Sequence, residues 1–288
     1  MTDYLNAELV LRQRLENTVI ARAFGVNVAL ERMRRFVRAG YVGAEHAPAL
    51  DDSIVLLLNE AAAVHHIPLS CIAFAAHDAL RLHITDRIGI NTPDLGWTQW
   101  CVFDLVDPEP WLIVPMGLFV PFRGTKRSES ALQRTDMLPL FFARSDGGTG
   151  VSVAANTNYE TIPNTPTRVS GTSLKVIINL PNYTTYERQI QLRCPANGTV
   201  SAQRLARIVA AKVRECVNNA SQQDTTMTEQ GWRFGAGVGC LQAEDIILLG
   251  IVFVSPGKVT PLLKARSDYD PFAPFHLAFN YDIDPSVL

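Results

Sequence analysis

The chain has 288 residues, of which 47% are apolar and 19% charged, and its formal net charge is −2. This length is enough for one large domain or two modest ones, with a sizeable core. The small net charge excludes a strong general attraction to nucleic acids or anionic membranes. The sequence therefore predicts neither a specific nucleic-acid partner nor a membrane partner. Because charges are depleted at the centres of interfaces, the low charged fraction indicates either self-association or a well-filled core.

Residues 1–90 are predicted to form a helical region. Thr2 or Asp3 can cap a first helix, whose apolar positions recur mostly every three or four residues as far as Val37. Gly25 is expected to divide this helix. The run 51–66 is apolar nearly all round and predicts a buried helix, and the run 71–83 predicts a third helix that begins after Ser70.

Residues 91–200 are predicted to be β-rich, because turn residues separate short runs of aromatic and β-branched residues. In the run 173–180, apolar residues occupy every second position, which is typical of a strand with one buried face. Many short strands of this kind favour a sandwich-like or barrel-like arrangement over alternating strands and helices. The predicted strands are 97–106, 111–120, 138–143, 151–155, 173–180 and 187–194.

Residues 201–288 are predicted to mix helix and strand and to pack back on the rest of the chain. Ser201 can cap an amphipathic helix over 202–217, and the runs 245–254 and 275–281 are predicted strands. The fold class is therefore expected to be α+β. A helical layer from the N-terminal region and one C-terminal helix would accompany a β-rich, sandwich-like middle.

No motif in the sequence identifies a catalytic, cofactor or metal site. The glycines at 235, 237 and 239 neither follow a strand nor open a helix, so they predict a tight turn and not a phosphate-binding loop. The six histidines lack the spacing of metal ligands, and no G-x-S-x-G motif occurs. Asp104, Asp107 and Glu109 could bind a cation or act in acid–base catalysis, but the prolines between and after them favour a turn that ends a strand. We therefore expect no cofactor, no metal and no enzymatic activity.

Five widely spaced cysteines without a C-x-x-C motif argue against a disulfide framework and against a thiolate zinc site. The N-terminal segment contains no apolar core of the kind that a secretory signal needs. No stretch holds the ~18 uninterrupted apolar residues that span a bilayer. The sequence thus predicts a protein of a reducing, cytoplasmic compartment.

These features together predict a structural protein that assembles into a homo-oligomer, with other structural proteins as further candidate partners. The layout is similar to that of icosahedral virus capsid subunits, in which a helical base carries a β-sandwich, and this resemblance implies a place in a virion. The predicted interface pairs an apolar and basic N-terminal region with acidic groups near the C-terminus of a neighbouring copy. Its residues are Leu5, Leu9, Arg12, Arg22, Arg34, Arg35, Arg38, Asp268 and Asp270.

The alternative is an enzyme or small-molecule binding protein with a pocket between the helices and the sheet. Trp97, Trp100, Trp111 and Asp104 would be the residues that line such a pocket. The native mass separates the two hypotheses, because a large closed oligomer favours assembly and a monomer with a deep pocket favours ligand binding.

Overall fold

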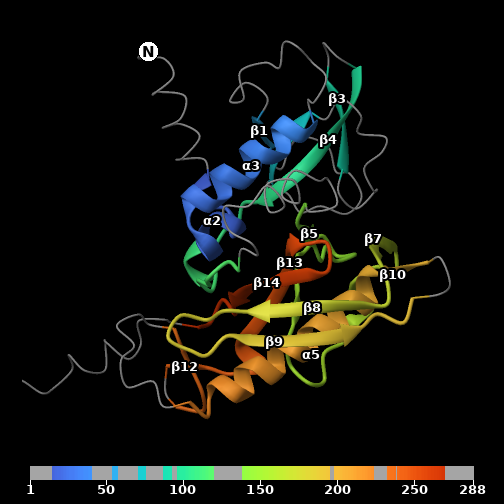
Figure 1. The fold of residues 1–288 in the computed structure, drawn as a ribbon. Helices are drawn as coiled ribbons and strands as arrows, with labels where there is room; N and C mark the ends of the chain where they lie inside the picture. The colour runs from blue at the N-terminus through green and yellow to red at the C-terminus, as the bar shows by residue number, and fades with distance from the viewer. Residues whose placement is uncertain are drawn as a thin grey trace, which may run out of the picture.

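A computed structural model describes residues 15–40, 54–57, 71–75, 87–92, 96–119, 138–194, 198–223, 232–237 and 239–269. For 34–40, 54–57, 74–75, 87–92 and 96–100 it describes the backbone alone. Two larger sheets and three α-helices make up most of this part of the chain (Figure 1). The protein is therefore an α+β protein with several β-sheets.

The first two described helices, α2 (Val19–Phe24) and α3 (Val26–Gly40), are separated by a single residue. That residue is Gly25, which has a φ of 95° and donates its backbone N–H to the Ala21 carbonyl at 2.8 Å. Glycine adopts this left-handed region without a steric penalty, so the chain can end one helix and begin the next at once. The predicted break at Gly25 is confirmed.

The smaller sheet is antiparallel, with the strand order β1-β2-β4-β3. Its strands are β1 (Ile54–Leu57), β2 (Cys71–Ala75), β3 (Arg87–Thr92) and β4 (Gly96–Leu105). The strand predicted over 97–106 is confirmed as β4. The helices predicted over 51–66 and 71–83 are wrong at 54–57 and 71–75, and the rest of both runs lies outside the described residues.

The error in these two segments has a physical cause. A short run that is apolar on every side is compatible with a buried helix and with a strand covered on both faces. Here β2 pairs with β1 on one side and with β4 on the other, and these pairings decide the outcome. The predicted helical region 1–90 thus contains three strands as well as helices.

The larger sheet has the strand order β5-β13-β14-β8-β9, and β6 also pairs with β13. Its members are β5 (Leu140–Phe141), β6 (Val151–Ser152), β8 (Ser173–Ile178), β9 (Tyr186–Gln191), β13 (Ile246–Ser255) and β14 (Lys258–Ala265). All pairs are antiparallel except β14 with β8. The strands predicted over 173–180 and 245–254 are confirmed as β8 and β13. Those predicted over 138–143, 151–155 and 187–194 are present in shorter form.

Two smaller strand pairs complete the β structure of the described chain. Strand β7 (Pro166–Ser170) pairs antiparallel with β10 (Thr199–Ser201), and β11 (Arg233–Phe234) pairs parallel with β12 (Cys240–Leu241). The strand predicted over 111–120 is wrong. A 3₁₀ turn, η3 (Pro110–Leu112), is followed by irregular chain in which Ile113 makes only an isolated bridge. Pro110 suits the first turn of a helix, and Pro115 has no N–H to offer a sheet.

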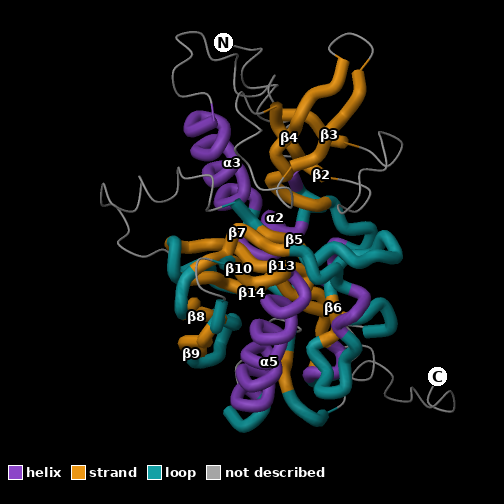
Figure 2. Tube along the Cα trace, turned by 90° about the vertical axis from the view of Figure 1, so that its right-hand side faces the viewer, coloured by secondary structure: helices purple, strands orange, loops and turns teal. Residues whose placement is uncertain are grey.

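Helix α5 (Ala202–Ala220) covers one face of the larger sheet (Figure 2). It begins as predicted at Ser201, whose side-chain oxygen accepts a hydrogen bond from the Arg204 backbone N–H at 3.4 Å. Leu205, Val209 and Val213 are fully buried. The predicted amphipathic helix is therefore confirmed, and its apolar stripe faces the core.

Helix α2 connects the two sheets, because it contacts both β4 and β14. The Met116 backbone N–H donates to the Ala23 carbonyl at 2.8 Å, which ties the chain after η3 to this helix. From α3, the buried Arg32 donates from Nη2 to the Phe253 carbonyl of β13 at 3.0 Å. One continuous apolar core results, and it includes Leu112, Ile113 and Val114 from the segment after β4.

Candidate functional site

The three carboxylates predicted as a candidate site do not act together in the structure. Asp104 is fully buried at the start of α2, where its two carboxylate oxygens each accept the Ile20 backbone N–H at 3.1 Å. The Leu105 N–H donates to the same carboxylate at 2.8 Å. The N-cap residue of α2, Thr18, makes no side-chain capping hydrogen bond. The Asp104 carboxylate instead accepts a backbone N–H at the start of this helix. Burial raises the pKa of Asp104 to about 7, although the hydrogen bonds from Thr18, Ile20 and Leu105 act in the opposite direction.

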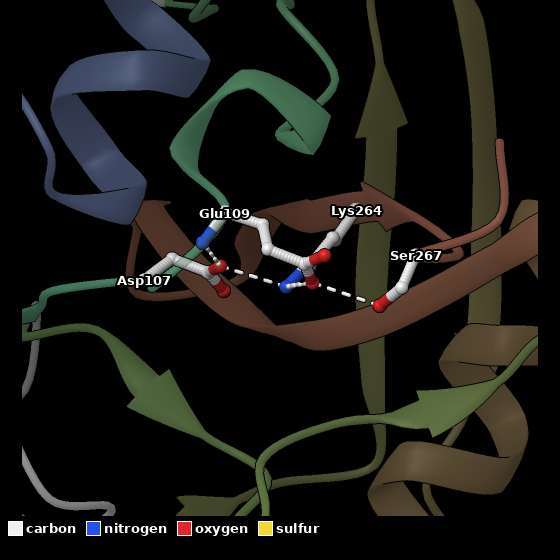
Figure 3. Close-up of polar contacts among 4 residues, drawn as sticks. All are labelled: Asp107, Glu109, Lys264 and Ser267. Carbon is white, nitrogen blue, oxygen red and sulfur yellow. Dashed lines mark hydrogen bonds and ion pairs between the residues drawn. The ribbon is translucent and has the colours of Figure 1, made fainter. Parts of the chain in front are cut away.

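Asp107 and Glu109 instead converge on Lys264, and together with Ser267 they form what we call the lysine clamp (Figure 3). Lys264 Nζ lies 2.7 Å from Asp107 Oδ1 and 3.0 Å from Glu109 Oε2. The Ser267 hydroxyl donates to Glu109 Oε2 at 2.8 Å. The side chains of Lys264 and Asp107 are each only 10% exposed, and that of Glu109 is 29% exposed. The clamp is therefore a nearly buried, hydrogen-bonded ionic cluster.

Backbone pairing brings Asp107 and Glu109 close to Lys264. The chain that leaves η3 bridges to β14 at Ile113 and Lys264, and the Val114 N–H donates to the Leu263 carbonyl at 2.9 Å. Within the turn, Asp107 Oδ1 accepts the Glu109 backbone N–H at 2.8 Å, which fixes the separation of the two carboxylates. The turn that ends β4, predicted from the prolines, is thereby attached to the larger sheet.

The electrostatics of the clamp favour a structural role. Hydrogen bonds from Ser267 and Lys264 lower the pKa of Glu109, so this carboxyl is held as the carboxylate. Two carboxylates share one ammonium group, and the Ser267 hydroxyl is used as a donor to Glu109. All six histidines of the chain lie outside the described residues. With the groups that are described, the cluster can join two segments, but it offers no activated nucleophile.

Sequence reasoning missed Lys264, the residue that organises the clamp. A signal was present, because Lys264 is the one charged residue within the otherwise apolar run 261–265. Lysine is almost never buried without a partner, so its position required a carboxylate from elsewhere in the chain. The partner Asp107 is 157 residues away in sequence, and no local pattern could have identified it.

The predicted interface residues fall into three groups. Arg22 is exposed at the end of α2 and donates from Nη2 to Asn17 Oδ1 at 3.1 Å, whereas Asp268 is paired with its neighbour Arg266. The pairing of such groups between two copies of the chain stays a prediction. The backbone of α3 carries Arg34, Arg35 and Arg38, whose side chains are not described, and Leu5, Leu9, Arg12 and Asp270 lie outside the described residues.

Two of the residues that were predicted to line a pocket, Trp111 and Asp104, lie in different environments. Trp111 is 57% exposed on η3, whereas Asp104 is fully buried and its carboxylate accepts hydrogen bonds from backbone N–H groups. These two residues therefore do not line one common cavity. The side chains of Trp97 and Trp100 are not described. Burial also raises the pKa of the Cys71 and Cys216 thiols to about 12, which leaves both thiols protonated and unreactive near neutral pH.

The glycine-rich segment forms a turn between two short strands. Gly235 follows β11 with a φ of 150°, and Gly239 precedes β12 with a φ of 71°. The Gly235 N–H donates to the Leu241 carbonyl at 3.0 Å, and the Cys240 N–H donates to the Gly237 carbonyl at 3.0 Å. These bonds hold the segment in a turn against its own flanking strands, as predicted. The expectation that no strand precedes the glycines is wrong, because β11 ends directly before Gly235.

Among the described residues, no three His, Cys, Asp or Glu side chains gather in a way that could hold a metal ion. None of the described helices is both long enough and apolar enough to cross a membrane. No protein-family model matches the chain, and comparisons with curated proteins and with solved structures gave no match.

Proposed function

We propose that the protein is a non-enzymatic structural subunit that self-associates through the surface around Trp111. The observation that carries this proposal is the exposure of Trp111, the one large apolar side chain that is exposed among the described residues. Tryptophan is among the residues most enriched at the centres of interfaces, where burial of its ring contributes much of the binding energy. A second copy of this chain is the occupant that we propose for this surface.

The position of Trp111 supports a preformed contact. Element η3 packs against α2, on which Arg22 is also exposed, so an aromatic residue and an arginine lie on neighbouring elements. Arginine is enriched with tryptophan at interface centres. The lysine clamp holds Glu109, two residues before Trp111, to β14. Because η3 is thus attached at its start, Trp111 would lose little conformational entropy on binding.

The described ionisable groups also support a structural role over a catalytic one. Asp104 serves the start of α2, and Asp107, Glu109 and Lys264 join a turn to the larger sheet. The capsid-type subunit, its sandwich-like middle and a place in the virion belong to the same proposal. They rest on the resemblance in layout to icosahedral capsid subunits.

Native mass tests the proposal. Size-exclusion chromatography with light scattering should give an oligomer for the unmodified chain and a smaller species for Trp111→Ala. Thr172→Ala, an exposed change in the turn before β8, is the control and should keep the mass unchanged. A monomeric unmodified chain, or an undiminished oligomer in Trp111→Ala, would contradict the proposal.

A truncation tests the N-terminal part of the predicted interface. It must end before Leu15, because Leu15, Val19 and Ile20 are buried in the core and their removal would unfold the chain. Removal of residues 1–14 should reduce the oligomeric mass if Leu5, Leu9 and Arg12 contribute. An unchanged mass would restrict the interface to the Trp111 surface.

A further inference from the structure

Helix α5 has a basic outer face. Apart from the carboxylate Glu215, its ionisable side chains at neutral pH are Arg204, Arg207, Lys212 and Arg214. Arg204 and Arg207 are exposed, and Lys212 and Arg214 are partly exposed. The whole chain has a net charge of −2, so the positive charge of this helix is opposite in sign to the charge of the whole chain. We call Arg204, Arg207 and Arg214 the α5 basic face.

The one carboxylate of the helix is already neutralised. Glu215 accepts a hydrogen bond from Lys212 Nζ at 2.7 Å, and Arg188 of β9 lies 3.4 Å from its other oxygen. In the described part of the chain, Arg204, Arg207 and Arg214 have no carboxylate within ion-pair distance, and Arg207 stacks over the Tyr159 ring at 5.4 Å. No described carboxylate thus neutralises these three arginines, although η5 (Tyr159–Thr161) adds one exposed carboxylate, Glu160, to the neighbouring surface.

The stability of the helix does not explain this arrangement of charges. Acidic residues stabilise the first turn of a helix and basic residues the last turn. In α5 the first turn has no acidic residue but contains Arg204, and the last turn has no basic residue. Charges that oppose the helix dipole without a local benefit are typical of functional surfaces.

The spacing of the arginines indicates an extended anion. Arg204, Arg207 and Arg214 are separated by three and seven residues, so they follow one side of the helix. At ~1.5 Å per residue the row is about 15 Å long, which exceeds the size of a single phosphate group. Arginine forms planar, paired hydrogen bonds with phosphate oxygens and carries its charge at every physiological pH.

We propose that the α5 basic face binds the phosphate backbone of single-stranded nucleic acid without sequence preference. Binding of this kind depends on a local row of cations and is compatible with the slightly negative net charge of the chain. An acidic segment of another protein is the alternative occupant, which the experiment must distinguish from a nucleic acid. The proposal does not depend on self-association.

Fluorescence anisotropy with a labelled oligouridine of about 20 nucleotides tests the proposal. Affinity should fall linearly with salt on logarithmic axes, with a slope of about −2 if three phosphates are contacted. The triple variant Arg204→Gln, Arg207→Gln, Arg214→Gln should lose roughly tenfold or more in affinity and should show a shallower slope.

A second triple variant controls for net charge. Arg144→Gln, Arg233→Gln, Arg266→Gln removes the same charge from other parts of the surface and should change affinity by less than about twofold. Circular dichroism establishes that both variants are folded; if the α5 triple variant is not, Arg204→Gln and Arg214→Gln are measured singly, and each should weaken binding. No binding at low salt, equal losses in both triple variants, or binding of polyglutamate in place of oligouridine would overturn the proposal.

Discussion

Replacement of Lys264 by methionine would test the lysine clamp most directly. Methionine keeps an unbranched apolar stem of similar length, so the change removes the ammonium group with little loss of packing. Asp107 and Glu109 then face each other in a nearly buried site without a counter-ion. Loss of one partner from a buried ion pair costs about 3–5 kcal/mol. Because Glu109 is 29% exposed and can be partly rehydrated, we expect a loss near the lower end, about 3 kcal/mol.

Urea unfolding followed by circular dichroism at neutral pH would measure this loss. The matched control is Lys175→Met, which breaks the cross-strand pair of Lys175 with Glu187 on the exposed face of β8 and β9. That pair is 35% and 42% exposed, so its loss should cost no more than about 1 kcal/mol. If Lys264→Met costs as little as Lys175→Met, the clamp is not a stabilising element and the argument fails.

The pH dependence of the clamp provides a second measurement. The pKa of Glu109 is lowered in the folded state, so its contribution to stability is present above the unfolded value of about 4.3 and is lost as the pH falls below it. The difference between the unmodified chain and Lys264→Met should therefore narrow on acidification. Neutralising Asp107→Asn and Glu109→Gln together with Lys264→Met should recover part of the lost stability, because no unpaired buried charge remains.

Three further changes test other parts of the structure. Asp104 has a folded-state pKa of about 7, above the unfolded value of about 3.9, so the stability linked to its proton is lost as the pH rises. Between pH ~5 and ~8, urea unfolding should show the free energy of unfolding of the unmodified chain falling by about 2–3 kcal/mol relative to Asp104→Asn, and parallel curves would contradict this. Leu205→Ala removes a fully buried side chain from the core-facing side of α5 and should lower the free energy of unfolding by about 2–5 kcal/mol, which a thermal melt measures. An unchanged melting temperature would refute the packing of this face. Gly250→Ala places a Cβ 2.5 Å from the Leu140 carbonyl oxygen, so β5 must move away from β13; the Phe142 amide, which donates to the Leu249 carbonyl, should then exchange hydrogen faster, and unchanged exchange would be inconsistent with the close approach.

Some features of this protein follow from local sequence alone. The cap at Ser201 and the apolar stripe through Leu205, Val209 and Val213 determine α5, because helix geometry places these positions on one side. The alternation in 173–180 determines β8, and Gly25 determines the break between α2 and α3. In each case, the interactions that decide the structure lie within a few residues of one another.

Local sequence patterns do not predict the contacts of the candidate site. Asp104, Asp107 and Glu109 occur close together in sequence, yet Asp104 serves α2 while the other two bind Lys264 from the far end of the chain. Their separate roles depend on the bridge between Ile113 and Lys264, which forms only when the turn after β4 meets β14.

Strands β1 and β2 show the same limit at the level of secondary structure. The apolar runs at 54–57 and 71–75 fit a buried helix as well as a strand, and each becomes a strand because a neighbour satisfies its backbone N–H and C=O groups. The sequence by itself thus determined the elements whose periodicity has one solution. The tertiary structure decided where buried charges and continuous apolar runs find their partners, since both require groups that are distant in the chain.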